Sequence, residues 1–193
     1  MSCIAATLAR LETDAGLYAR LMQHAAGLPN DVLFARMLVS QSGGIGVLPP
    51  GLGLAADSFG ELLSRHFPGA GPLGLTCTDG LDVLRGPERD DLVGLLLDGR
   101  AGADRSETWM AEIVAAGCMG GDHLWQDLGL WSRRDLSRLM TENFPGLAAK
   151  NDRDMKWKKF LYRQICDREG IHACPAPSCQ VCVDYAKCFV SGA

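Results

Sequence analysis

The feature that most constrains how this 193-residue chain can fold is a cluster of cysteines close to its C-terminal end. Four of the eight cysteines fall within fifteen residues with the spacing C-x4-C-x2-C-x5-C, namely Cys174, Cys179, Cys182 and Cys188. Closing a loop of that length costs about 2 kcal/mol, whereas a metal held by four thiolates contributes roughly 10 to 16 kcal/mol in zinc peptides. The spacing therefore predicts a C-terminal cysteine-rich metal-binding loop.

The spacing alone leaves three interpretations open: an iron–sulfur cluster, a zinc ion, or disulfides without metal. Zinc sites usually pair two C-x2-C knuckles across a longer spacer, and this segment has only one knuckle. The first three cysteines instead match the C-x4-C-x2-C run of plant-type ferredoxins. Iron–sulfur is therefore favoured over zinc, and disulfides are the least favoured in a reducing compartment.

The charge balance and the N-terminal segment argue for a cytoplasmic protein. The formal net charge of −4 gives no reason to expect nucleic acid or an anionic membrane as partner. The first residues carry Arg10, Glu12 and Asp14 and lack a basic segment before an apolar block, so they predict a helix rather than a secretion signal. The apolar stretches are also shorter than the roughly 20 residues that span a bilayer.

The rest of the sequence predicts a mainly α protein, because no segment sustains the alternation of a strand. Helices are expected over residues 17–25, after an Asn30 cap, over residues 59–66, from Pro87 to about Asp98, from about Ser106, after a Ser132 cap, and from about Asp154 to Glu169. The glycines and prolines of residues 42–53 predict a loop. We expect a helical body over residues 1–150, followed over residues 151–193 by a basic helix and the four-cysteine module.

The last predicted helix carries a local positive excess in an acidic chain. Its apolar stripe is expected to contain Trp157, Phe160, Leu161 and Ile165, so the opposite side would hold Lys159, Tyr162, Arg163 and Cys166. Cys166 is therefore not expected in the core. Such a face would suit an anionic cluster or molybdate, and nearby cations would favour the thiolate of Cys166. The alternative is that these charges are a solvated helix surface.

Histidines offer weaker candidates for metal handling. His123 follows Cys118 by five residues across two glycines, so both side chains could reach one ion and form a secondary molybdenum site. The alternative is that His123 caps or packs the helix that it begins. His66 lies on an apolar helix face and is expected to be a hydrogen-bonded core histidine. His172 precedes Cys174 by two residues and is left out of the ligand set.

Several longer runs carry a resemblance that spacing does not show. The runs HLWQDLGL from His123, SRRDLSRLM, FPGLAAKN, MKWKKFLYRQIC up to Cys166, and CPAPSCQVCVDYAKCF resemble the NifQ family over about residues 118–189. No resemblance is found for residues 1–110, and no function is assigned to them.

The resemblance implies a metallocluster carrier rather than a turnover enzyme. In that family the four-cysteine motif is held to bind an iron–sulfur cluster that also carries molybdenum, which would assign Cys174, Cys179, Cys182 and Cys188 to the cluster. The molybdenum would arrive as molybdate or a molybdenum–sulfur species and be donated for nitrogenase cofactor assembly, with the NifEN scaffold and the NifH reductase as implied partners. Two other functions remain open: a structural zinc-binding interaction module, and an iron–sulfur electron carrier.

Overall fold

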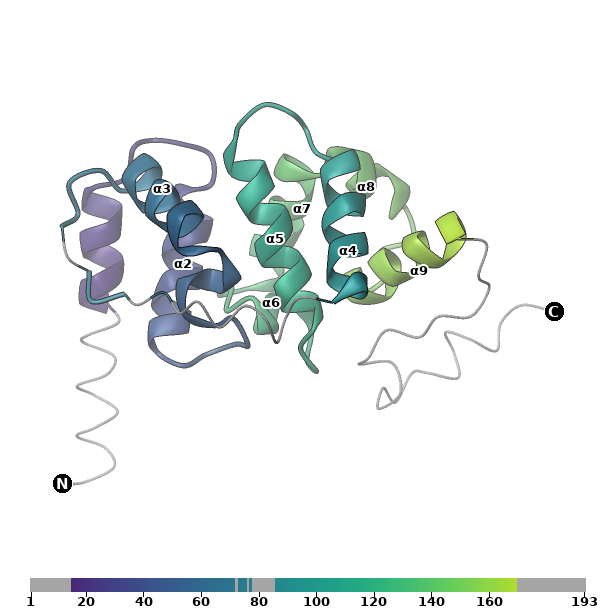
Figure 1. Ribbon diagram of the computed structural model, residues 1–193, viewed down its shortest axis with the longest axis horizontal. Coiled ribbons are helices and arrows are strands. Elements are labelled where there is room, and N and C mark those ends of the chain that lie inside the picture. Colours follow the sequence, from purple (N-terminus) through teal and green to yellow (C-terminus); the bar gives the residue numbers. More distant parts are fainter. Residues whose placement is uncertain (1–14, 72, 76, 78–85, 170–193) are drawn as a thin grey trace, which may run out of the picture.

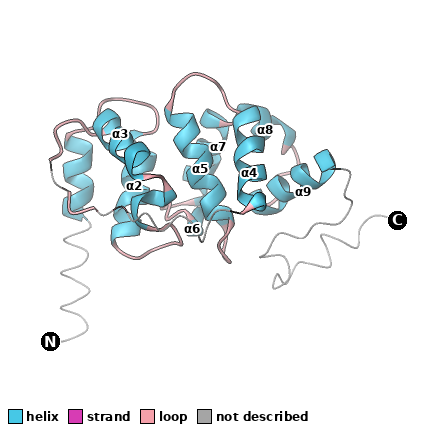
Figure 2. Cartoon of the chain, viewed as in Figure 1, coloured by secondary structure: helices cyan, strands magenta, loops and turns pink. Residues whose placement is uncertain are grey.

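The computed structural model describes residues 15–71, 73–75, 77 and 86–169 (Figure 1). Residues 15–23 are helical. The helices that follow are α2 (Asp31–Ser42), the 3-10 turn η1 (Pro50–Gly53), α3 (Ala56–His66), α4 (Pro87–Asp98), α5 (Ser106–Cys118), α6 (Leu124–Asp127), α7 (Arg133–Asn143), α8 (Pro145–Lys150) and α9 (Trp157–Glu169). The described residues contain no strand, which confirms the expected mainly α class (Figure 2).

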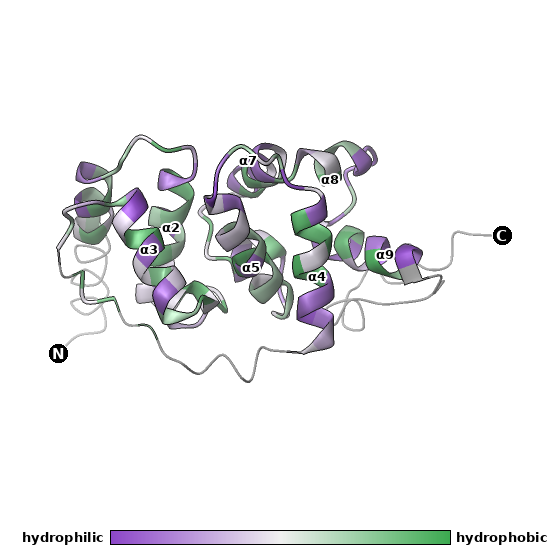
Figure 3. Cartoon of the chain, turned by 45° about the horizontal axis from the view of Figure 1, so that its top comes forward, coloured by the Kyte–Doolittle hydropathy of each residue, from purple (hydrophilic) through white to green (hydrophobic). Residues whose placement is uncertain are grey.

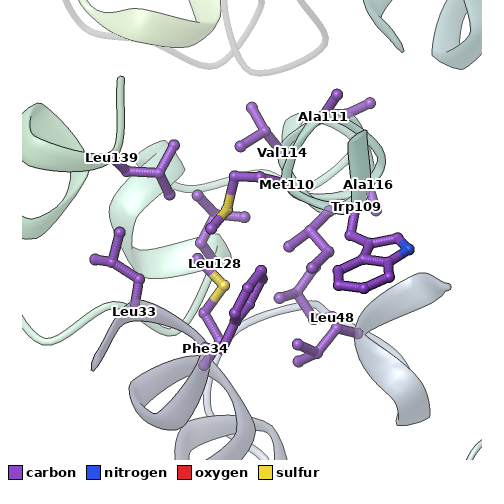
Figure 4. Packing of buried hydrophobic residues seen from close by; sticks show 14 of the residues in the cluster. Leu33, Phe34, Leu48, Trp109, Met110, Ala111, Val114, Ala116, Leu128 and Leu139 are labelled. Carbon is purple, nitrogen blue, oxygen red and sulfur yellow. The ribbon is translucent and has the colours of Figure 1, made fainter. Parts of the chain in front are cut away.

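Helix α5 forms the centre of the fold. Eleven of its thirteen residues are buried, because apolar residues cover most of its circumference and a helix of that kind must be surrounded; the other two, Thr108 and Glu112, share one side. α4 packs along it, and α3, η1 and α6 also contact it, so α5 joins the α2–α3 end of the molecule to the α4–α9 end (Figure 1). Phe34 of α2 and Leu128, which follows α6, converge on Met110 of α5 (Figure 4).

Local signals place several helix ends where they were predicted. Pro87 occupies the first turn of α4, whose residues change from hydrophilic to apolar along the helix (Figure 3). Ser132 caps α7 in a reciprocal capping box with Asp135. α2 ends at Ser42 and irregular chain follows, as predicted, except for the short 3-10 turn at Pro50–Gly53.

Asn30 precedes the first residue of α2 as predicted, but the prediction that its side chain caps the helix is wrong. The Asn30 side chain makes no capping bond. Its amide instead donates to Ser106 Oγ at 2.8 Å and to Asn143 Oδ1 at 2.7 Å. Because Asn30 is buried where α2, α5 and α7 meet, satisfying polar groups of neighbouring helices takes precedence over a local cap.

Helix α9 begins three residues later than predicted. Asp154 has a positive φ of 48°, which no helical residue adopts. The Asn151 side chain holds this turn by accepting from Met155 N at 2.9 Å and donating to Met155 O at 3.0 Å. The helix therefore starts at Trp157 rather than at Asp154.

His66 is a hydrogen-bonded core histidine, as predicted. Its ring is fully buried, and Nδ1 lies 2.6 Å from Asp31 Oδ1. The ring meets Phe34 edge-on, with 4.7 Å between the centroids. Burial lowers the pKa of His66 below its ordinary value of 6.5, and the hydrogen bond to Asp31 opposes that shift only in part.

This burial predicts a loss of stability in mild acid. The folded chain favours neutral His66, so its stabilisation is complete above the unfolded pKa near 6.5 and declines as the pH falls below that value. We expect the free energy of unfolding, measured by urea titration between pH 7.5 and 5.5, to fall less steeply in His66→Asn than in the parent chain. His123→Gln serves as the control because His123 is exposed. Equal slopes in His66→Asn and the parent chain would show that His66 does not cause the dependence.

Candidate functional site

The four predicted cluster cysteines and His172 lie outside the described residues. What the structure does describe is α9, whose last residue, Glu169, precedes Cys174 by five positions in the sequence. The position of α9 on the body therefore sets where the chain enters the cysteine segment. The described part of the candidate site is the set of contacts that holds α9 in place.

A buried ion pair holds the start of α9 against the body. The Lys158 ammonium pairs with the Asp127 carboxylate of α6 and also donates to Gly120 O at 2.7 Å. The two side chains are only 5% and 1% exposed. Two ions taken out of water at such depth need good mutual geometry and further hydrogen bonds, and the Gly120 carbonyl supplies one of them.

The segment between α5 and α6 is shaped around the Asp127 carboxylate. The backbone N–H of Asp122 donates to Asp127 Oδ2 at 3.0 Å. A Cβ at Gly120 would lie 2.5 Å from Asp127 Cγ, so a residue with a side chain there would displace the carboxylate. Gly120, the first glycine of the pair that the sequence suggested as a metal-binding turn, thus makes room for the Asp127 carboxylate, which accepts from Asp122 N and from Lys158.

The expected division of α9 into an apolar and a polar side is wrong in part. Tyr162 and Cys166 are buried, whereas Arg163 is exposed and Lys159 is half-buried. The helix contacts α4 and is also tied to the α5–α6 segment through Lys158, so it buries a wider stripe than one apolar face requires. Lys158 is buried as well, so the positive charges of α9 are not all a solvated surface.

Cys118 and His123 differ in their access to solvent. Cys118 is fully buried at the end of α5, where burial raises its pKa to about 12 although the Lys158 charge opposes the shift. Its thiol is therefore protonated at neutral pH and is a poor metal ligand. His123 is exposed, and its backbone carbonyl accepts from Gln126 N at 2.8 Å and Asp127 N at 3.0 Å, as expected of the residue that begins α6. The secondary molybdenum site stays a prediction that this conformation does not favour.

Within the described ranges, no group of three or more His, Cys, Asp or Glu side chains is placed to hold a metal ion. An open groove between α4 and α9 is lined by Asp90, Asp91, Gly94, Ile165 and Arg168. Its charges are of both signs, and Arg168 is already 3.2 Å from Asp98. The groove therefore does not define a site for one class of ligand. No described helix is both long and apolar enough to cross a membrane.

Comparison with known families covers both the described body and the cysteine segment. The model of the NifQ family matches residues 33–190, which is most of the chain. The chain belongs to the NifQ family. It is 44% identical over 171 residues to Protein NifQ of Azotobacter vinelandii, which covers 83% of this chain and 88% of the relative. It is 41% identical over 161 residues to Protein NifQ of Rhodobacter capsulatus, covering 81% and 86% respectively. No solved structure matches the chain.

The NifQ match extends the resemblance seen in the sequence towards the N-terminus. The resemblance seen in the sequence covers about residues 118–189, and residues 1–110 showed none. The family match begins at residue 33, inside α2, so it includes all the helices from α3 to α9 and most of α2. The helices that surround α5 are therefore part of the NifQ fold and not an unrelated N-terminal addition.

Sequence reasoning missed the two residues that hold α9 in this NifQ chain, Asp127 and Lys158. A signal for Lys158 does exist. At 100° per residue, Lys158 lies between Ile165 and Tyr162 on the helix circumference, at the edge of the apolar stripe. A lysine in that place needs a buried acceptor, but the sequence gives no means to find Asp127, which lies 31 positions away.

Proposed function

We propose that this NifQ chain carries molybdenum on an iron–sulfur framework and donates it for assembly of the nitrogenase iron–molybdenum cofactor. Family membership supports involvement in nitrogen fixation, in the biosynthesis of that cofactor. The observation that carries the finer proposal is the four-cysteine motif, which lies inside the family match that ends at residue 190.

The four cysteine ligands suit an iron–sulfur cluster that carries molybdenum. Four thiolates from one short segment, those of Cys174, Cys179, Cys182 and Cys188, suit the iron atoms of a cluster, and molybdenum in reduced surroundings also prefers sulfur ligands. The bound cluster would supply sulfide ligands for molybdenum. A donor must release its metal, so at least one ligand of molybdenum has to be replaceable rather than a fixed protein thiolate.

The described residues would set the position of the cysteine segment and add positive charge near it. Lys158 and Asp127 fix the start of α9, and the helix leads directly into the cysteine segment. Arg163 is exposed on α9, where Asp167 lies 3.9 Å from it, and Lys159 is half-buried. Cations at these positions would partly offset the negative charge of a thiolate-ligated cluster and of molybdate.

A transfer assay tests the proposal. The molybdenum-loaded chain is mixed without oxygen with the NifEN scaffold and the NifH reductase, the proteins are separated, and molybdenum is measured on each. We expect molybdenum to move from the chain to the scaffold faster than it does from an equal amount of free molybdate. Molybdenum that stays on the chain, or that reaches the scaffold equally well from molybdate, would contradict a donor role.

A further inference from the structure

Three large apolar side chains stand out on the surface of the described residues. Ile45 is 55% exposed, Val47 is 43% exposed and Trp131 is 48% exposed. Ile45 and Val47 belong to the irregular chain after α2, and Trp131 belongs to the turn between α6 and α7. Single exposed apolar residues need no explanation, but a group of them indicates a contact surface.

The two segments that carry these side chains pack against each other. Val47 N donates to Asp127 O at 2.9 Å, and Ile45 N donates to Ser40 O at 2.8 Å. A Cβ on Gly46 would lie 2.7 Å from Asp127 O, and one on Gly129 would lie 2.6 Å from Ser40 Cβ. Both glycines also have positive φ, so this close approach depends on glycine at both positions.

Trp131 is held in place although half of it is exposed. Its ring lies 4.7 Å from that of Tyr18, and the Arg36 guanidinium lies over it at 5.1 Å. Arg36 is itself fixed by an ion pair with Asp135. A tryptophan that is already ordered loses little side-chain entropy on binding, and tryptophan and arginine are the residues that most often dominate binding energy.

The charges beside this apolar centre are positive in sum, because Arg36 and Arg133 are each paired with an aspartate and Arg134 adds a further positive charge. Arg133 and Arg134 follow Trp131 directly at the start of α7, and both are exposed. Arg133 is 3.0 Å from Asp154 in a solvent-exposed pair, which stabilises little, and Arg134 makes no ion pair within the described residues. If two copies met through this surface, the net positive charge of one copy would face that of the other, which disfavours self-association.

Asp127 ties this surface to α9. The Asp127 carbonyl holds Val47, and the Asp127 carboxylate holds Lys158. A partner docked here would therefore contact the element that also anchors the helix leading into the cysteine segment.

We propose that Ile45, Val47 and Trp131, with Arg36, Arg133 and Arg134 around them, form a docking surface for a different protein. That partner would present an apolar centre surrounded by aspartate and glutamate. We call the surface formed by these six residues of the NifQ chain the Trp131 surface. Taking the metal acceptor as the partner rests on the proposed function, so the NifEN scaffold is the probe.

Binding of the intact, metal-loaded chain to immobilised NifEN, measured without oxygen, tests the Trp131 surface. We expect Ile45→Ser/Trp131→Ala to weaken the affinity by about tenfold or more, and Arg134→Glu to weaken it without touching the packed Tyr18–Trp131 pair. Arg100→Glu is the matched control, because Arg100 is exposed at the end of α4. Rising salt should weaken the parent complex more than that of Arg134→Glu.

Three results would overturn the inference. The first is unchanged affinity in Ile45→Ser/Trp131→Ala and in Arg134→Glu, and the second is no binding by the parent chain. The third is a parent chain that dimerises through Trp131, which would make the surface a self-contact. Iron and molybdenum contents of the same samples report separately on molybdenum carriage, so lost binding with molybdenum still present would contradict the docking surface and not the carrier role.

Discussion

Cys182→Ser should reduce the iron and molybdenum bound to the purified chain to near zero while the helical body stays folded. Cys182 belongs to the one C-x2-C knuckle of the motif, and a serine hydroxyl is a poor substitute for a thiolate on a soft metal. The body should persist because its core is built from helices between α2 and α9. The measurements are metal content, far-UV circular dichroism and the urea midpoint of oxygen-free preparations.

Cys77→Ser is the matched control for that substitution. Cys77 lies outside the motif, and its sulfur donates to Leu54 O at 3.6 Å, a contact that a hydroxyl can also make. We expect this variant to keep its metal. Loss of helical signal in Cys182→Ser would instead mean that the body depends on the cysteine segment, and the division at residue 150 would then be wrong.

Lys158→Met should lower the free energy of unfolding by about 3 to 5 kcal/mol, the loss typical when one partner of a buried ion pair is removed. The methionine fills similar space, but the Asp127 carboxylate would be left buried without its cation. The start of α9 would lose its anchor to the α5–α6 segment, so metal retention should fall as well. Urea unfolding of the full chain measures the first effect, and metal analysis measures the second.

The double variant Lys158→Met/Asp127→Asn separates charge from packing. Asparagine keeps the shape of the side chain and can still accept from Asp122 N, but no buried charge remains. We expect most of the stability lost in the single variant to return. A double variant as unstable as Lys158→Met would show that the lysine matters through its packing or its bond to Gly120 O, and not through the ion pair.

Local chemistry explains what could be predicted from the sequence. Pro87 and Ser132 mark helix starts because proline lacks an N–H and serine can accept from the first turn, and neither effect depends on the rest of the fold. The buried face of α3 was also predictable, since Phe59, Leu62 and His66 keep helical spacing.

Contacts between distant segments explain what could not be predicted. Asn30 bonds to Asn143, 113 positions away, and Lys158 bonds to Asp127, so both depend on which helices meet. Tyr162 and Cys166 are buried because α9 packs on α4 and on the α5–α6 segment together, whereas a single-face pattern assigns them to solvent. For the site, spacing indicated the four cysteines as ligands, and that assignment stays a prediction.

The most direct test of molybdenum carriage is a complete metal analysis of the chain purified without oxygen from cells supplied with molybdate. Iron, molybdenum, zinc and acid-labile sulfide are measured on one sample. We predict iron and sulfide together with molybdenum at less than one atom per chain, because a donor passes its cargo on. Iron and sulfide without any molybdenum would instead indicate an electron carrier. One zinc per chain without sulfide would contradict the account and indicate a structural zinc module.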